Sequence, residues 1–145
     1  MDIRGSYQFD APPQQVWDLL VDTDAVAACL PGCESLVPIG ENTYRAALTM
    51  GIAAITGRYE GTIKMKDLEP PVSYQLVVEG RGKQGFVTGG GDISLTAADG
   101  GTQVAVAGTV QVGGTIARVG QRLLGSVSKM MMDRFFACLC KRLAD

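Results

Sequence analysis

The C-terminal stretch, residues 113–145, constrains the fold more than any other part of the chain. Its apolar residues recur in steps of three and four, which places them along one side of a helix. Two glycines precede the pattern, Thr115 can cap a helix, and Lys141 and Arg142 suit its last turn. The spacing predicts one helix over 115–144, about 40 Å long, whose apolar side needs a broad partner. That side holds Ile116, Val119, Leu123, Val127, Met130, Met131, Phe135, Cys138 and Leu139.

The rest of the chain mostly alternates apolar and polar residues, as half-buried β-strands do. Residues 2–10 predict the first strand, and two short helices follow, the second capped by Asp22 or Thr23. Strands are then expected at 35–39, 43–50, 55–66, 72–78, 93–97 and 104–112. This order predicts an α+β domain in which a curved antiparallel sheet of six or seven strands wraps around the long C-terminal helix.

The length of 145 residues and the apolar content of 46% predict one globular domain over residues 1–145. A net charge of −2 gives no reason to expect a nucleic-acid partner. No basic leader with an apolar run opens the chain, and no segment is apolar enough to predict a transmembrane helix. We therefore expect a cytoplasmic protein. The absence of histidine removes the commonest general base and metal ligand, so no metal site is predicted. Nothing in the sequence indicates an oligomeric state.

The four cysteines, Cys29, Cys33, Cys138 and Cys140, do not have zinc-site spacing. They predict small, separate thiols in a reducing compartment. The alternative is a site that combines the two pairs.

A glycine-rich segment from Gly80 to Gly85 matches the G-x-G-x-x-G dinucleotide motif. That motif needs a helix to begin there, but strand-like residues follow, so we expect glycines that let a bent sheet turn a corner. By strand alternation, Phe86 falls on the opposite face of the sheet from Ile93 and Leu95. Either a bulge among the glycines corrects this, or Phe86 stands at an open edge of the sheet.

Four glycines, Gly5, Gly57, Gly61 and Gly108, fall on the inward face of the predicted strands. A glycine there leaves space beside the sheet. Either the final helix approaches closely at these points or the space is a ligand cavity, and four such positions favour the cavity.

By the same parity, the charged strand residues face away from the helix; they are Arg4, Asp10, Arg45, Arg58, Glu60, Lys64, Lys66, Glu79, Arg81 and Asp92. The interior would be apolar, with Tyr7, Tyr44, Tyr59 and Tyr74 as its polar groups. Tyrosine can orient a carbonyl oxygen, but without a base or metal it is a poor catalyst, so a binding protein is predicted. The alternative is that these tyrosines are ordinary core aromatics.

Several motifs together resemble the CoxG family of carbon monoxide dehydrogenase subunits, in the START-like (SRPBCC) helix-grip superfamily. They are LPGCESL at 30–36, GRYEG at 57–61, Pro70-Pro71, GFVTG at 85–89, VGG at 112–114 and GQRLL at 120–124. The resemblance implies a helix-grip fold and an accessory protein of a molybdenum hydroxylase such as carbon monoxide dehydrogenase. It also implies a quinone-like or other lipophilic ligand, no covalently bound cofactor, and a place in the cytoplasm or at the inner face of the membrane.

The resulting hypothesis is a non-catalytic protein that holds a hydrophobic small molecule, quinone-like or lipid, between the sheet and the C-terminal helix. The expected ligand-binding residues are Tyr44, Leu48, Met50, Ile55, Tyr59, Ile63, Phe86, Val110, Val112, Val119, Leu123, Val127 and Met130. The first alternative is a START-like enzyme, a cyclase, aromatase or hydrolase. It needs Glu34, Glu60 or Asp92 inside the cavity, which a one-residue register slip would bring about. The second is an interaction module with a filled core.

Overall fold

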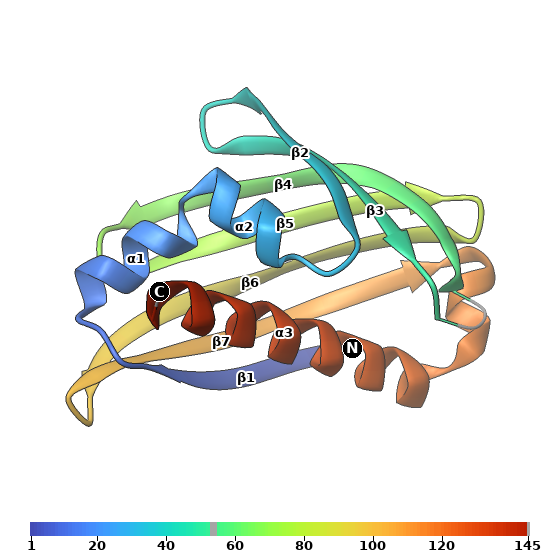
Figure 1. The fold of residues 1–145 in the computed structure, drawn as a ribbon. Helices are drawn as coiled ribbons and strands as arrows, with labels where there is room; N and C mark the ends of the chain where they lie inside the picture. Colours follow the sequence, from blue (N-terminus) through green and yellow to red (C-terminus); the bar gives the residue numbers. More distant parts are fainter. Residues whose placement is uncertain (53–54, 145) are drawn as a thin grey trace.

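The computed structural model describes residues 1–52 and 55–144. Within these residues the chain forms one seven-stranded antiparallel sheet, two short helices after the first strand and a long C-terminal helix (Figure 1). The strand order is β1-β7-β6-β5-β4-β3-β2, so the first two strands of the chain form the two edges. The predicted α+β arrangement is therefore confirmed.

Five of the seven strands are longer than the sequence pattern indicated, especially around the glycine-rich segment, whereas β3 has the predicted length and β1 is one residue shorter. The strands are β1 (Asp2–Phe9), β2 (Cys33–Gly40), β3 (Thr43–Met50), β4 (Gly57–Glu69), β5 (Ser73–Gly82), β6 (Gly85–Ala98) and β7 (Gly101–Gly113). The helices are α1 (Pro13–Leu20), α2 (Thr23–Cys29), the 3-10 helix η2 (Gly114–Val119) and α3 (Gln121–Ala144).

Local chemistry explains where the two short helices begin. Pro13 occupies the first position of α1, where its missing N–H costs no hydrogen bond. Asp22 caps α2, because its carboxylate accepts hydrogen bonds from the backbone N–H groups of Asp24 and Ala25, at 2.9 and 3.3 Å. Of the two predicted caps, Asp22 is the one used.

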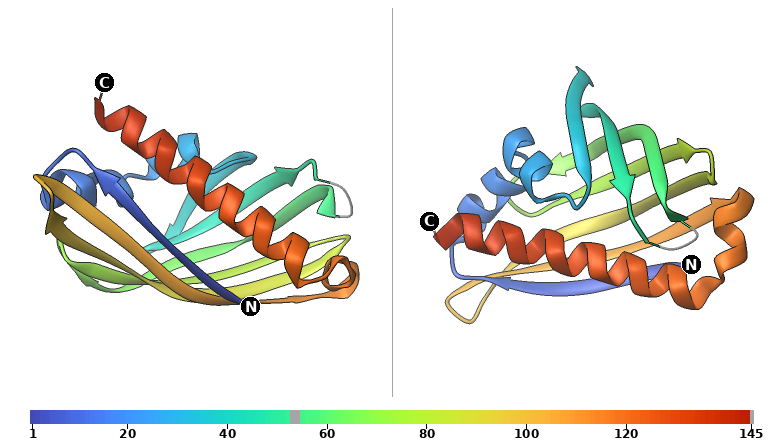
Figure 2. Two further views of the ribbon diagram at one scale, coloured as in Figure 1. Left: turned by 90° about the horizontal axis from the view of Figure 1, so that it is seen from below. Right: turned by 45° about the vertical axis from the view of Figure 1, so that its right-hand side comes forward.

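The sheet curves into a trough, and α3 lies along its concave face (Figure 2). The main core lies where α1, α2 and the C-terminal half of α3 meet the sheet, around Phe9, Val16, Val104 and Leu139. A smaller cluster of Ile55, Ile116 and Leu124 lies near η2. The covered face is continuous, which is why the strands show alternating burial.

The prediction of one helix over 115–144 is wrong at its start. Residues up to Val119 form η2, and Gly120, with a φ of 90°, separates it from α3. Thr115 lies inside η2 and caps no α-helix. Two apolar residues three positions apart, Ile116 and Val119, suit a 3-10 turn as well as an α-helix, so the pattern alone did not show the break.

The glycine-rich segment is a β-hairpin. β5 and β6 pair without a register shift from Ser73 opposite Ser94 to Gly82 opposite Gly85. No helix begins there, so the segment lacks the geometry of a dinucleotide motif. The predicted bulge is wrong, and so is the edge position of Phe86. Phe86 lies on an inner strand with its side chain on the outer face, 46% exposed.

A disulfide joins Cys29 of α2 to Cys138 of α3, with a Cα–Cα distance of 5.4 Å. The expectation of four separate thiols is therefore wrong for this pair; Cys33 and Cys140 are free and partly buried. The two bonded residues are 109 positions apart, and only the packing of α2 on α3 brings them together. Neither cysteine spacing in the sequence carried that information.

The described residues contain no group of three or more Cys, Asp or Glu side chains placed to hold a metal ion. None of the described helices combines the length and hydropathy needed to cross a membrane.

Candidate functional site

At three of the four inward glycines a Cβ would meet neighbouring atoms, whereas at Gly57 the nearest atom is Cγ of Gln84, 3.8 Å away. A Cβ on Gly61 would overlap the backbone of Glu79, and one on Gly108 would overlap the backbone of Gly90. A Cβ on Gly5 would meet the ring of Tyr7. At these three positions the close neighbour is an adjacent strand or Tyr7, so the predicted close approach of the C-terminal helix is wrong there; Gly61 does border cavity 1.

Two adjoining cavities nevertheless lie between the sheet and α3. Cavity 1, of about 230 Å³, lies toward η2, and cavity 2, of about 350 Å³, lies beside α2 and the middle of α3. Leu48, Ile63, Val78 and Met131 line both cavities. Small-molecule sites usually measure roughly 300–1,000 Å³, so the two together are large enough for an elongated ligand. A filled core, the second alternative from the sequence, does not fit this geometry.

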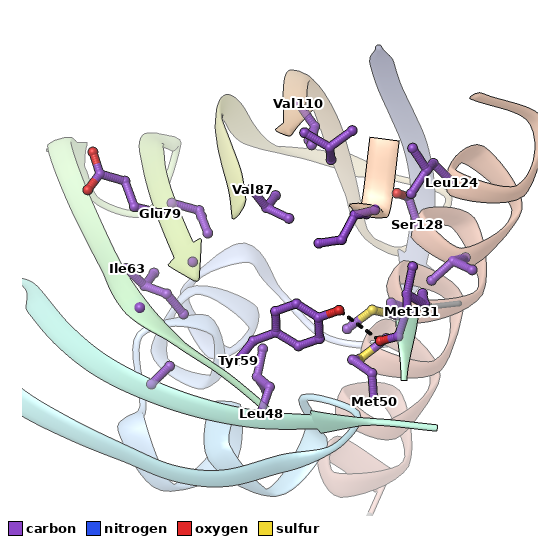
Figure 3. Close-up of a pocket in the computed structure, with 18 of the residues that line it drawn as sticks. Leu48, Met50, Tyr59, Ile63, Glu79, Val87, Val110, Leu124, Ser128 and Met131 are labelled. Carbon is purple, nitrogen blue, oxygen red and sulfur yellow. Dashed lines mark hydrogen bonds between the residues drawn. The ribbon is translucent and has the colours of Figure 1, made fainter. Parts of the chain in front are cut away.

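Cavity 1 is walled by carbon atoms from the sheet, η2 and α3. Figure 3 shows the ring of Tyr59 projecting between Leu48, Met50 and Met131. The Tyr59 hydroxyl donates a hydrogen bond to the backbone carbonyl of Ile55, at 2.8 Å. That hydroxyl is therefore already engaged within the protein.

Cavity 2 is also apolar, with Tyr44, Tyr74 and Thr23 as its side chains that carry a hydroxyl. Tyr74 is 5% exposed, and its ring meets that of Trp17 edge to face, with centroids 5.4 Å apart. Burial raises the pKa of Tyr74, and to a lesser extent that of Tyr59. Both hydroxyls are therefore neutral at physiological pH.

Most of the residues predicted to line the cavity do so. Tyr44 lines cavity 2, and Leu48 and Ile63 line both cavities. The others that line cavity 1 are Met50, Ile55, Tyr59, Val110, Val112 and Val127. Their role in ligand binding stays a prediction.

Phe86, Val119, Leu123 and Met130 line neither cavity. Phe86 points outward, and its neighbour Val87 lines cavity 1 instead. From α3, cavity 1 is lined by Leu124, Val127, Ser128 and Met131, so Val127 is where it was predicted, while Leu124 and Met131 take the places expected for Leu123 and Met130. Val119 belongs to η2, before the break at Gly120, and packs in the smaller cluster.

Ser128 was not anticipated as a lining residue. It faces cavity 1 from α3, and Figure 3 shows its side chain beside Leu124. Leu124, Ser128 and Met131 follow Gly120 in steps of four, four and three. A helical pattern begun at that glycine, a residue type that often ends helices, would therefore have placed them on one face.

The acids required by the enzyme alternative keep their carboxylates at the surface, although Glu60 contributes to the wall of cavity 1. Arg58 forms ion pairs with Glu34 at 3.4 Å and with Glu60 at 3.2 Å, and all three side chains are at least half exposed. Asp92 is exposed as well. The backbone of Glu79 borders cavity 1, but its carboxylate points away from it (Figure 3). The described residues therefore place no acidic side chain inside.

Tyr7 lies outside both cavities. Its hydroxyl donates a hydrogen bond to Oδ1 of Asp133 at 2.8 Å, and its ring stacks on Phe136 with centroids 4.2 Å apart. Burial, followed by the nearby Asp133 carboxylate, raises the pKa of Tyr7 to about 12. This tyrosine holds α3 against β1 and does not serve a ligand.

A curved antiparallel sheet closed on a C-terminal helix, with an uncharged hollow between them, defines a protein of the helix-grip (START-like) class. The sequence model of the family described as the CoxG subunit of carbon monoxide dehydrogenase matches residues 5–144. The chain belongs to this family.

Solved structures share the fold of this chain. A conserved protein from Geobacillus kaustophilus is 39% identical, with a TM-score of 0.96 over 99% of this chain and 95% of that one. TTHA0849 from Thermus thermophilus and the protein Ara h 8.0201 are 16% and 14% identical. Each has a TM-score of 0.73 over 99% of this chain and 97% of its own, which shows a shared fold. No curated protein matches the chain.

Proposed function

We propose that this CoxG-family protein is a non-catalytic accessory protein that holds an uncharged hydrophobic molecule, quinone-like or lipid, in cavities 1 and 2. The observation that carries the proposal is the pair of adjoining apolar cavities. Of the two acidic residues that border cavity 1, Glu79 points its side chain away from it (Figure 3) and Glu60 is paired with Arg58 at the surface. An ionised group inside would be costly without a partner, and an apolar ligand needs none.

Affinity would come mainly from removing apolar ligand surface from water. At about 25 cal/mol per Å², each 100 Å² of ligand surface buried contributes roughly 2.5 kcal/mol, against the cost of immobilising the ligand. Tyrosine hydroxyls would then select among ligands of similar shape.

The partner we propose is a molybdenum hydroxylase such as carbon monoxide dehydrogenase, because the family carries that enzyme's name. The protein would meet it in the cytoplasm or at the inner face of the membrane. Titration of the purified enzyme into this protein by calorimetry tests the pairing, and heat no different from dilution would contradict it.

The binding proposal is tested by extracting the purified protein and searching the extract for quinones and lipids by mass spectrometry. Menaquinone and ubiquinone analogues should raise the melting temperature of ligand-free protein. Finding neither a ligand nor a shift would contradict the proposal.

Two variants on the same strand make this test specific. Val78→Phe places a ring at the junction of the two cavities, so it should abolish the thermal shift. Val77→Phe adds the same ring on the outer face, opposite Lys64 and Gly90, and should keep the shift. An equal shift in both variants would place the ligand elsewhere.

A further inference from the structure

Tyr74 is a deeply buried residue whose hydroxyl forms no hydrogen bond with a described side chain or backbone group. The residue lines cavity 2 and is 5% exposed, and burial is the cause of its raised pKa, with no hydrogen bond contributing. Its oxygen also keeps some accessible surface, because no buried side-chain oxygen of the described residues lacks a partner. A buried donor without a partner costs free energy unless something else accepts its hydrogen bond.

The other hydroxyls near the cavities are in different situations. Tyr59 already donates to Ile55. The remaining hydroxyl-bearing residues are only partly buried and so are more open to water than Tyr74; they are Thr23, Tyr44, Thr62 and Ser128. Tyr74 is therefore the group for which a ligand oxygen would make the largest difference.

We propose that the Tyr74 hydroxyl is the hydrogen-bond donor that seats an uncharged oxygen acceptor, such as a ketone or quinone carbonyl, in cavity 2. The apolar remainder of the ligand extends past Val78 and Met131 into cavity 1, since these residues border both spaces. This inference rests on the proposed function and deepens it, because it names the class and the orientation of the ligand.

The acceptor is uncharged because cavity 2 offers nothing to balance a charge. Its described lining contains no lysine and no arginine. Moving a carboxylate there would cost more than one neutral hydrogen bond returns. The site therefore discriminates against ionised fatty acids. Burial raises the pKa of Tyr74, so the hydroxyl keeps its proton and remains a donor through the physiological range.

The test uses two probes of the same shape, dimethylnaphthoquinone and dimethylnaphthalene, and a third, naphthoate, that carries a charge. The methyl groups of the quinone occupy the carbons that free thiols would attack. Dissociation constants measured for the ligand-free protein should be lowest for the quinone, higher for the hydrocarbon and highest for naphthoate. Naphthoate binding as tightly as the quinone would overturn the uncharged class.

Tyr74→Phe keeps the ring that packs on Trp17 and removes only the oxygen. It should weaken quinone binding about three- to tenfold and leave the hydrocarbon unchanged. Tyr7→Phe, which removes a hydroxyl outside both cavities, is the matched control and should change neither affinity. Melting curves of both variants establish that each is folded.

Each other outcome is decisive. Unchanged quinone affinity in Tyr74→Phe overturns the inference. The inference is also overturned if Ser128→Ala or Tyr44→Phe loses the preference for the quinone while Tyr74→Phe keeps it. The ligand would then bind in another orientation. In both cases the cavity still binds, so the proposed function stands. If neither neutral probe binds the wild-type protein, the proposed function fails together with the inference.

Discussion

Gly61 of β4 and Gly80 of β5 are direct cross-strand partners, but only Gly80 has room for a side chain. A Cβ on Gly61 would collide with the carbonyl of Glu79, whereas nothing lies within 4 Å of a Cβ on Gly80. The obstacle at Gly61 is backbone and cannot rotate away. The tight bend of the sheet at this point therefore depends on one glycine of the pair.

We expect Gly61→Ala to lower the free energy of unfolding by about 2–4 kcal/mol, because the two strands must separate locally. Gly80→Ala should change it by less than about 1 kcal/mol. Urea denaturation of both variants measures the difference. Equal losses would mean that the bend does not depend on Gly61.

Removing the Cys29–Cys138 disulfide should destabilise the fold by about 2–5 kcal/mol, since it closes a long loop between α2 and α3. Denaturation of the Cys29→Ala/Cys138→Ala variant measures this loss. The wild-type protein should lose a similar amount on addition of a dithiol reductant, and the variant should not respond. Cys33→Ala/Cys140→Ala, which removes the free thiols, is the control and should remain sensitive to reductant.

The hydrogen bond from Tyr7 to Asp133 should make stability depend on alkaline pH. The pKa of Tyr7 is raised from 10.0 to about 12 in the folded protein, so its contribution is complete below pH 10 and declines as the pH rises to about 12. Tyr7→Phe should cost about 1 kcal/mol at neutral pH. The difference in free energy of unfolding between Tyr7→Phe and the wild type, measured by urea denaturation, should shrink as the pH rises from 10 to about 12. A constant difference would contradict the assignment.

Asp133 has a pKa below its usual value, first because Lys129 donates a hydrogen bond to it and then because Tyr7 does. A carboxylate with a lowered pKa stabilises the fold above its unfolded pKa and loses that effect as the pH falls through the folded value. We expect Asp133→Asn to be less stable than the wild type at neutral pH, with the two converging in acid. Thermal denaturation from neutral pH to below the usual pKa of aspartate checks this, and parallel curves would argue against it.

Asp22 should contribute about 1 kcal/mol to stability as the cap of α2. Asp22→Ala removes the acceptor for the N–H groups of Asp24 and Ala25. Asp22→Asn retains a side-chain oxygen and should lose much less. Urea denaturation of both variants measures the cap, and equal losses would show that charge matters here more than the acceptor.

The order and facing of the elements could be predicted because one buried face imposes strict alternation on each strand. Tyr59 and Ile63 of β4 were placed correctly in this way, since a slip of one residue would have exposed both. The helix was harder to predict. The apolar steps continue through Ile116 and Val119 into α3, and only the backbone conformation at Gly120 shows that the α-helix begins after it.

Contacts between distant parts of the chain account for the remaining differences. Phe86 was expected among the ligand-binding residues, which required a bulge among the glycines, but the unbroken pairing of β5 with β6 turns it outward. The disulfide and the Tyr7–Asp133 hydrogen bond both join α3 to elements near the other end of the sequence. No local pattern records which residues meet in such a contact.

The covalent link between α2 and α3 also restricts where the molecule can open. While it is intact, it ties together the two helices that roof cavity 2, and α2 cannot swing away from α3 to admit a guest. At the opposite end the sheet leads into α3 through η2 and the single residue Gly120, and no such tie joins the described residues there. We therefore expect a ligand to enter and leave at the η2 end. The part of the ligand that enters first would then be the last part to leave.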